Sequence, residues 1–485
     1  MKKKFMSAAW LIAGAAVMFS SCSNDEDVIN GGNGNGNEPV QIISMQVANT
    51  GDNFIGTRAT DRPLYSSEAN QSIENVKVVL YKLNVATDAK DDAKKAAMYG
   101  EKTIVATKTF TPWMNGGVSS IYNDATKGHG RQASWTLATA DLITEEGVYG
   151  AYAVGYNTTN YSELETFDGL AKEGTFTTPL NVTVGDKVKE IFAGSALFEV
   201  KKEEVTAAEG NVNSFHFNVS LTLHRQIAGS IGYFTNIPTK GNIDNADKVG
   251  TKLRLVASAK NTQAVFAGFN SEYTGKEGKP STENVKYVVN GHTPATADAK
   301  FYGSTANDAY SVYEIALASW FNAQGGMDSN NDGLLNELDT WKNAIDEAQT
   351  TVKVKTGSVL GGSFMIPFEL VADKATFQLQ MLAENGDIIR YWNIRLPKTS
   401  TEDSQIGQFV RVIANDGGES IASAEENNIN YSIVRNHLYT IGARDNGDNP
   451  TDPGTDPDKP QDLNDETLIL RVNDNWEMIH HMEVD

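Results

Sequence analysis

One stretch of the sequence combines oxygen-bearing side chains with the spacing of a calcium-binding loop. It begins at position 328 and reads DSNNDGLLNELD. Calcium favours carboxylate and amide oxygens at the first, third, fifth and twelfth places of such a loop, with glycine at the sixth. The pattern predicts either a structural calcium ion that stiffens this region or a plain Asn- and Asp-rich turn before a helix. The calcium ligands would be Asp328, Asn330, Asp332 and Asp339.

The residue patterns of common catalytic sites do not occur in this sequence. Its seven histidines form no HExxH motif, and the chain has neither a G-x-S-x-G elbow nor a phosphate-binding loop. Carboxylates are so abundant that two of them close together do not indicate a glycosidase. We therefore expect a protein that is not an enzyme, with no cofactor apart from the calcium ion considered above.

The only cysteine, Cys22, follows a segment typical of an export signal. Met1 to Ser21 begins with lysines and continues into an apolar run, Ala8 to Phe19, which is too short to span a membrane as a helix. This arrangement predicts a lipoprotein signal peptide over residues 1–21 and a diacylglyceryl group and palmitate on Cys22. The acidic patch Ser23 to Asp27 resembles the surface-export signal of lipoproteins in Bacteroides-like bacteria. We expect an outer-membrane or cell-surface location.

Two arginines are candidates for proteolytic maturation. Arg58 lies in the sequence TRAT, and Arg62 lies in DRP. Trypsin-like cleavage before proline is disfavoured, because the amide that proline forms is tertiary and its ring is fixed. We therefore predict cleavage after Arg58 and keep Arg62 as the second choice. A solvent-exposed arginine with no such role is the alternative for both.

Residues 465–485 read as one long strand. The preceding residues 445–464 are rich in Pro, Gly and Asp, which predicts an exposed, extended tether. A strand held away from its own domain needs the sheet of another molecule, so we predict a donor strand. Its apolar side chains share one parity. They are Leu468, Leu470, Val472, Trp476, Met478, Met482 and Val484.

The dominant period of the whole chain is two, which is typical of half-buried strands. Two helices are expected, over Tyr310 to Asn322 and Leu335 to Gln349, and they do not alternate regularly with the strands. This favours two tandem antiparallel β-sandwich domains with short helices. A boundary is expected near residue 212, after the polar stretch Glu203 to Asn213. The expected strands include 76–80, 148–156, 215–223, 227–234, 364–370, 377–381, 388–396 and 409–413.

Composition limits the classes of partner. The 485 residues carry a formal charge of -21, and no cysteine follows Cys22. Binding to nucleic acid requires clustered lysine and arginine, so this charge argues against it. A core must be held by packing and sheet hydrogen bonds rather than by disulfides. These properties suit a protein that stays soluble outside the cell.

Taken in order along the chain, these features resemble the fimbrillins, the major or minor stalk pilins of type V pili in Bacteroidales. The lipoprotein signal ends at Cys22, and a strand-like segment, Val40 to Thr50, precedes GTRA at residues 56–59. The segment LHRQIA at 223–228 opens the second half, and VRNHLYTI at 434–441 precedes the tether. The strand Leu468 to Met478 completes the pattern.

This resemblance implies a mechanism of polymerisation. Family members have transthyretin-like domains and are exported as lipidated precursors. An Arg-specific surface protease then removes the lipid together with the first strand. The groove left behind is filled by the terminal strand of a neighbouring subunit. The implied partners are copies of the chain, anchor and tip pilins, the protease, and host or bacterial surface ligands. Residues 445–464 and 465–485 would be the tether and the donor.

The remaining predicted parts of the chain follow from the same resemblance. Residues 22–58 would form the lipidated propeptide, 59–212 the N-terminal domain and 213–444 the C-terminal domain. Two alternatives to a stalk pilin stay open. An anchor or tip pilin would use only part of this apparatus. A static glycan-binding surface lipoprotein would keep its lipid and would have no use for a donor strand.

Overall fold

The computed structural model describes a chain made almost entirely of β-strands. The described residues are 41–48, 73–98, 100–114, 117–124, 128–158, 161, 164–165, 177–179, 188–207, 210–243, 247–265, 291–322, 326–342, 344, 354–368, 377–395, 433, 438–444, 458–464 and 468–473.

Eight strands form the first sheet, in the order β3-β2-β6-β8-β11-β1-β5-β4. Neighbouring strands are antiparallel, except that β1 and β11 run parallel. In chain order the strands are β1 (Gln41–Ala48), β2 (Asn75–Leu83), β3 (Lys102–Phe110), β4 (Ser120–Asp124), β5 (Gly128–Thr136), β6 (Gly147–Tyr156), β8 (Phe192–Val200) and β11 (Phe217–Arg225).

Nine strands form the second sheet, in the order β17-β14-β20-β21-β26-β22-β12-β19, with β25 beside β12. Three pairs are parallel: β21 with β26, and β12 with both β22 and β25. The strands are β12 (Ala228–Thr235), β14 (Lys252–Ala257), β17 (Tyr310–Ala316), β19 (Val359–Met365), β20 (Phe377–Leu382), β21 (Ile388–Arg395), β22 (Leu438–Ile441), β25 (Gln461–Asp462) and β26 (Leu468–Asn473).

Smaller elements join or extend these two sheets. The hairpin β9 (Lys202–Ala207) with β10 (Gly210–Phe215) is one of them. Short pairings join β13 (Ile237–Pro238) to β18 (Leu334–Leu335) and β23 (Ala443–Arg444) to β24 (Asp458–Lys459), and a three-stranded sheet contains β7 (Thr177–Pro179), β15 (Asn261–Val265) and β16 (Gly291–Pro294). The described helical segments are α1 (Asp91–Ala97), η1 (Thr139–Asp141) and η5 (Leu317–Ser319).

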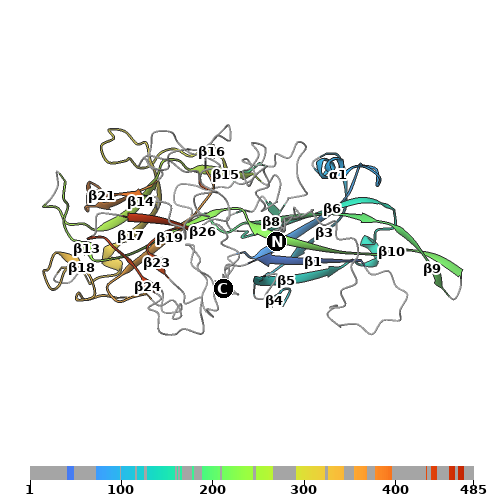
Figure 1. Ribbon diagram of the computed structural model, residues 1–485, viewed down its shortest axis with the longest axis horizontal. Helices are drawn as coiled ribbons and strands as arrows, with labels where there is room; N and C mark the ends of the chain where they lie inside the picture. The colour runs from blue at the N-terminus through green and yellow to red at the C-terminus, as the bar shows by residue number, and fades with distance from the viewer. Residues whose placement is uncertain are drawn as a thin grey trace, which may run out of the picture.

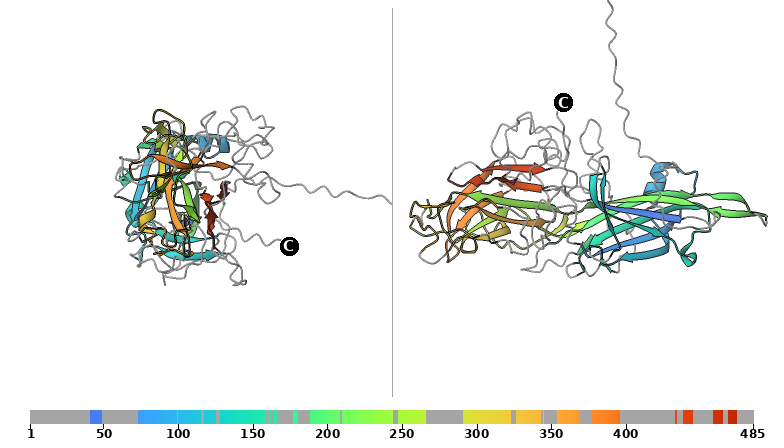
Figure 2. Two further views of the ribbon diagram at one scale, coloured as in Figure 1. Left: turned by 90° about the vertical axis from the view of Figure 1, so that its left-hand side faces the viewer. Right: turned by 90° about the horizontal axis from the view of Figure 1, so that it is seen from below.

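The two sheets follow one another along the long axis of the molecule (Figure 1). The strands of the second sheet lie at one end and those of the first sheet at the other. The β9–β10 hairpin extends past the first sheet, on the side away from the second. The view from below shows the same arrangement (Figure 2, right). The hairpin therefore marks one end of the elongated structure.

The predicted mostly β, antiparallel class is confirmed, and most expected strands lie close to where periodicity placed them. The two expected helices are wrong within the described residues. Tyr310–Ala316 is strand β17, followed by a single 3-10 turn, and Leu334–Leu335 is strand β18. In β17 the buried residues Tyr313 and Ile315 alternate with exposed Glu314 and Ala316, so its period is two.

The chain passes from the first sheet to the second later than the expected boundary at residue 212. Residues 203–207 and 210–213 belong to the two strands of the β9–β10 hairpin instead of a linker, and β11 still belongs to the first sheet. The crossing follows Arg225, whose buried guanidinium donates from Nε and Nη2 to Glu190 Oε1 at 3.0 and 2.7 Å. Gln226 then donates its backbone N–H to the carbonyl of Ile191.

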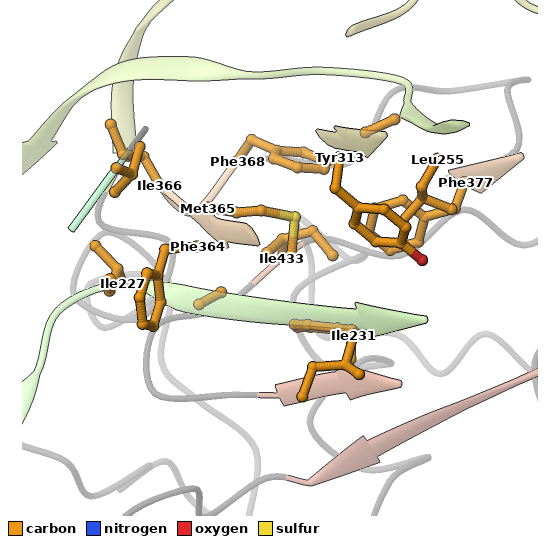
Figure 3. Close-up of a cluster of buried hydrophobic side chains, with 14 of the residues drawn as sticks. Ile227, Ile231, Leu255, Tyr313, Phe364, Met365, Ile366, Phe368, Phe377 and Ile433 are labelled. Carbon is orange, nitrogen blue, oxygen red and sulfur yellow. The ribbon is translucent and has the colours of Figure 1, made fainter. Parts of the chain in front are cut away.

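Two hydrophobic clusters hold these sheets. One is confined to the first sheet and includes the buried side chains of β1 and the facing side of β11. The other begins on the opposite side of β2 and β6 and continues through Ile227 into the second sheet. Figure 3 shows a part of it, where Ile231, Tyr313, Phe364 and Phe377 come together from strands far apart in the sequence. The second cluster therefore joins the two halves of the molecule.

Candidate functional site: a strand and its groove

Strand β1 lies inside the first sheet, between two strands that come from much later in the chain. Its residues Gln41 to Val47 pair in parallel with Phe217 to Leu223 of β11. On its other side, Ile42 to Ala48 pair antiparallel with β5. The strand expected over Val40 to Thr50 is thus confirmed for Gln41–Ala48, and it occupies a central place in the sheet.

The side chains of β1 alternate between the core and the opposite side of the sheet. Ile43, Met45 and Val47 are fully buried, whereas Ile42, Ser44 and Gln46 are half-buried. The buried three belong to the cluster that also contains Trp135 of β5 and four residues of β11. Each large apolar side chain contributes about 1.5–3 kcal/mol when fully buried. The apolar groove around β1 is lined by Trp135, Phe217, Val219, Leu221 and Leu223.

Gln41 fixes the beginning of β1, a role that the sequence did not reveal. Its side-chain Nε2 donates to the carbonyls of Ile143 and Phe215 at 2.8 and 2.9 Å, and its Oε1 accepts from the Ile143 backbone N–H at 2.8 Å. Its own carbonyl accepts from the N–H of Leu137. Gln41 is 1% exposed. A polar residue at the start of an apolar strand was the only signal that could have identified it.

Removal of β1 would divide the first sheet. Strands β3, β2, β6, β8 and β11 would remain on one side of the gap, and β5 and β4 on the other. Seven residues of β11 would lose their pairing partners, and the apolar groove would be open to water. Unpaired backbone groups and exposed apolar side chains are both unfavourable, so a groove of this kind requires a strand in it.

The residues predicted to release β1 lie outside the described part of the chain. They are Arg58 and Arg62, between β1 and β2 in the sequence, and Cys22, the predicted lipidation site, lies outside the described part as well. Their roles stay predictions. Cleavage after Arg58 would cut the covalent connection between β1 and the rest of the fold, because β1 ends at Ala48 and β2 begins at Asn75.

The predicted donor strand is not held away from its own domain, which corrects the sequence interpretation. Leu468–Asn473 forms β26, which pairs antiparallel with β22 and parallel with β21. Leu468 is fully buried. Leu470 and Val472 lie opposite Ile441 and Tyr439 of β22. The alternating pattern correctly identified a strand, but the chain's own second sheet offers a place for it. Trp476 and Met478 lie outside the described residues.

The predicted tether is also corrected over its last part. Asp458–Lys459 pairs with Ala443–Arg444, and Gln461–Asp462 pairs with β12. Leu463 is fully buried, and the indole N–H of Trp392 donates to its carbonyl at 3.2 Å. Proline and aspartate still permit short edge pairings of two residues, so their frequency did not exclude these contacts.

The predicted calcium loop is an ordered turn held by its own side chains. Asp328 accepts from the backbone N–H groups of Asp332 and Gly333, and Asp339 accepts from those of Ser329 and Asn336. The hydrogen bond from the Asn336 side chain, followed by those from the Leu334 N–H and the Asn330 side chain, lowers the pKa of Asp332. The helix expected after the loop is replaced by β18.

Calcium binding stays a prediction. Within the described ranges, no group of three or more His, Cys, Asp or Glu side chains is placed to hold a metal ion. This finding covers the three predicted carboxylate ligands, Asp328, Asp332 and Asp339, as the structure places them. Likewise, no helix among the described residues is both long enough and apolar enough to cross a membrane.

Comparison with known proteins gives only distant likenesses. No protein-family model and no curated protein matches the sequence. Among solved structures, the chain is similar to a candidate cell adhesion protein from Bacteroides eggerthii, with 13% identity, a TM-score of 0.33, and coverage of 91% of this chain and 97% of that one. It is also similar to the fimbrial anchor protein Mfa2 from Porphyromonas gingivalis, with 9% identity, a TM-score of 0.31, and coverage of 90% and 97%.

A candidate adhesin from Bacteroides thetaiotaomicron gives 8% identity, a TM-score of 0.34, and coverage of 90% and 97%. By their descriptions, these three solved structures are adhesion or fimbrial proteins. At identities and TM-scores this low, the similarity assigns neither a family nor a function to this chain.

Proposed function

We propose that this protein is the stalk subunit of a cell-surface fibre of the type V fimbrial kind. The chain is exported as a lipoprotein precursor with lipid on Cys22, and an Arg-specific protease cuts it after Arg58. Subunits then join by donor-strand exchange, in which residues 465–485 of one copy enter the β1 groove of the next. Anchor and tip pilins are further partners, and the fibre supports adhesion to host or bacterial surfaces.

The position of β1 is the observation that carries this proposal. A strand near the beginning of the chain is built into the middle of a sheet, and a long connection that contains Arg58 links it to β2. One cut in this connection makes the strand a separate peptide, held by backbone pairing, by three buried apolar side chains and by the hydrogen bonds of Gln41. Another strand of the same pattern can then replace it.

The predicted donor has the pattern that this groove requires. Three of its apolar residues, Leu468, Leu470 and Val472, have the same spacing as Ile43, Met45 and Val47 of β1. An incoming strand gains main-chain hydrogen bonds while its alternate side chains enter the groove. Because the groove and the donor lie at different places on the subunit, the contact is heterologous and can be repeated to build a filament.

The pairing of β26 within its own sheet favours a second candidate function. If β26 stays beside β21 and β22, the protein is a static surface lipoprotein, with glycan binding as the candidate role. The stalk function requires β26 to leave these strands. An anchor or tip pilin would likewise use only the groove or only the donor.

The test is SDS gel electrophoresis, without prior heating, of protein sheared from the cell surface. We expect a ladder of oligomers that collapses to a monomer on boiling. A chain without residues 465–485 and a chain with Arg58→Ala should both give no ladder, and the Arg58→Ala chain should keep its lipid. As a control, Arg62→Ala should still polymerise. A monomer in every lane would reject the stalk function and leave the static lipoprotein or the anchor.

A further inference from the structure

The β9–β10 hairpin is an arm with two open edges, and one of them continues the groove around β1. Among the described strands, β9 and β10 pair only with one another. Both ribbon views show the hairpin beyond the end of the first sheet (Figures 1 and 2). An isolated pair of strands is marginally stable in water and exposes backbone groups at its edges. A further strand paired along one of these edges would stabilise the hairpin.

The strands of the arm and the strands beside the groove share one register. Strand β8 runs into β9, and β10 runs into β11. The numbers of paired residues add up to 417 both for Arg225 with Phe192 and for Gly210 with Ala207. A constant sum means that both strands have the same number of residues between the two ladders. Strand β10 therefore leads into β11 and β9 follows β8 in one register, although the printed pairs of β8 with β11 are His224 with Ala193 and Arg225 with Phe192.

Two hydrogen bonds identify which edge of β10 faces the groove. Gln226 donates its N–H to Ile191 on the β8 side, so even-numbered residues of this ribbon point their backbone groups toward β8 and β9. Odd-numbered residues must then point toward β1. In agreement, the carbonyl of Phe215 accepts from the Gln41 side chain at the start of β1. The free edge of β10 is thus the same edge that β1 occupies on β11.

Strand β1 covers only the part of this edge that belongs to β11. It pairs with Phe217 to Leu223, whereas the continuous edge begins at Gly210. In the same register, Pro39 would lie opposite Phe215, where it has no N–H to donate. The residues before it, GGNGNGNE at 31–38, also have low strand propensity. The precursor strand is therefore not suited to pair along β10.

The predicted donor is long enough to cover the whole edge. Its alternating pattern runs from Leu468 to Val484, which spans about 56 Å as a strand, whereas the seven residues paired with β1 span only about 23 Å. The excess cannot continue far beyond Leu223, because the chain crosses to the second sheet after Arg225. The open edge of β10 lies at the other end, and a donor with Leu468, Leu470 and Val472 in the β1 groove reaches it with its later residues when it runs antiparallel to β11, opposite to β1.

Two of the exposed sheet edges in this region, those of β3 and β10, also differ in their protection. The outer strand β3 carries Lys102 and Lys108, and its pairing with β2 is interrupted by a bulge. Such features hinder pairing with another chain. Strand β10, with the sequence GNVNSF, has no charged residue and no proline. Its open edge is not guarded against an incoming strand.

We propose that the open edge of β10 is the second half of the donor-strand groove, and that it pairs with the part of residues 465–485 of a neighbouring copy that the β1 groove cannot hold. This inference rests on the proposed stalk function. The arm would lengthen the contact between subunits and slow their dissociation, and it would stay open in the precursor.

A matched pair of variants tests this directly. Asn213 and Glu204 lie opposite one another in the hairpin, and their backbone groups point to opposite edges of it. Asn213→Pro removes an N–H from the edge that continues the groove, and Glu204→Pro removes one from the other edge. Full-length protein is cut after Arg58. At high dilution of the protein, a fluorescent peptide of residues 465–485 is then bound to it. Fluorescence anisotropy then gives the rate of peptide release.

We expect Asn213→Pro to release this peptide about three- to tenfold faster than the unchanged chain, and Glu204→Pro to leave the rate unchanged. A peptide of residues 467–473, which has the same seven-residue length as the part of β11 that β1 covers, should dissociate at the same rate from all three. A third variant, in which Asn-Gly replaces residues 204–213, should speed release of the long peptide only. Its two-residue turn keeps the register of the remaining ribbon.

The outcomes separate the two proposals. Equal effects of Asn213→Pro and Glu204→Pro, or faster release of the short peptide from the trimmed arm, would overturn the role of β10 and leave donor-strand exchange standing. Failure of the long peptide to bind the unchanged chain would overturn the stalk function itself, and the inference with it.

Discussion

Gln41 joins the first residue of β1 to two other segments through its side-chain amide. The three hydrogen bonds to Ile143 and Phe215 are shielded from water, since Gln41 is almost fully buried. A buried polar group that loses its partner costs about 1–3 kcal/mol. Gln41 therefore contributes to how long β1 stays in the groove after cleavage.

We predict that Gln41→Ala speeds the loss of the propeptide strand by at least about tenfold, since it leaves backbone groups of Ile143 and Phe215 without a partner. The measurement is the release of fluorescently labelled propeptide from protein cut after Arg58. Gln46→Ala, on the half-buried side of the same strand, is the control and should have a small effect. Equal rates for both variants would contradict this role of Gln41.

In two buried tyrosines of the second sheet, replacement by phenylalanine should have opposite effects on the free energy of unfolding. The Tyr313 hydroxyl is buried with no hydrogen-bond partner among the described residues, and burial raises the pKa of this hydroxyl (Figure 3). The Tyr233 hydroxyl accepts from the Lys355 backbone N–H at 2.8 Å. Removal of the Tyr313 hydroxyl removes the free-energy cost of burying it, whereas removal of the Tyr233 hydroxyl breaks a hydrogen bond.

Tyr313→Phe should accordingly raise the free energy of unfolding by about 1 kcal/mol, and Tyr233→Phe should lower it by about the same amount or more. Urea unfolding followed by tryptophan fluorescence measures both. Destabilisation by both substitutions would mean that Tyr313 has a partner outside the described residues.

At the scale of elements, the segment that contains β24, β25 and β26 is attached to its own sheet by short pairings. Two of these strands have only two residues each. At Gly442, before the segment, the positive φ of 78° and the close approach of the Tyr233 carbonyl leave no room for a Cβ atom. The chain is thus folded tightly against β12 at this point. Release of β26 must overcome these contacts and the burial of Leu463 and Leu468.

Leu463→Ala should make this release easier without changing the donor residues. Loss of a fully buried leucine costs about 2–5 kcal/mol, and here the cost falls on the form in which β26 occupies its own sheet. We expect faster growth of the ladder in a time course of protein cut after Arg58. The control is Asn464→Ala at the exposed neighbouring position. Slower growth of the ladder would mean that the pairing of β26 within its own sheet assists donor-strand exchange.

At the scale of the whole molecule, selective cleavage depends on where arginines lie. The described arginines lie in β-strands, where the extended, paired backbone cannot enter a protease site without local unfolding. They are Arg131, Arg225, Arg254, Arg390, Arg395, Arg444 and Arg471. Arg58 lies between β1 and β2 in sequence.

Limited digestion by an Arg-specific protease should therefore cut after Arg58 and leave the paired arginines intact. Native mass spectrometry should give the mass of the whole chain, because β1 remains in the groove. Denaturing mass spectrometry should show a cut between Arg58 and Ala59 and no cut after the seven arginines in described strands. Loss of the propeptide under native conditions would mean that the groove alone does not retain β1. Early cuts at Arg131 or Arg254 would contradict protection by the strands.

Several features could be predicted from the sequence because their signal is local. Alternation of apolar and polar residues depends only on the geometry of one strand, so it identified Gly147–Tyr156, Ala228–Thr235 and Ile388–Arg395 to within a residue or two. The same alternation identified β26 as a strand, and the resemblance to the fimbrillins pointed to β1. Tyr310–Ala316 was misread as a helix, because its short apolar run suits either period until neighbouring strands select one.

Only the tertiary structure decided which strands lie side by side. The partners of β1 begin about 90 and 175 residues away from it in sequence, and nothing in an alternating pattern specifies them. The same holds for β26, whose apolar face suits its own second sheet as well as a neighbour's groove. The sequence determined which faces must be buried, since this follows from each residue's own chemistry. What buries them was decided by packing between distant segments.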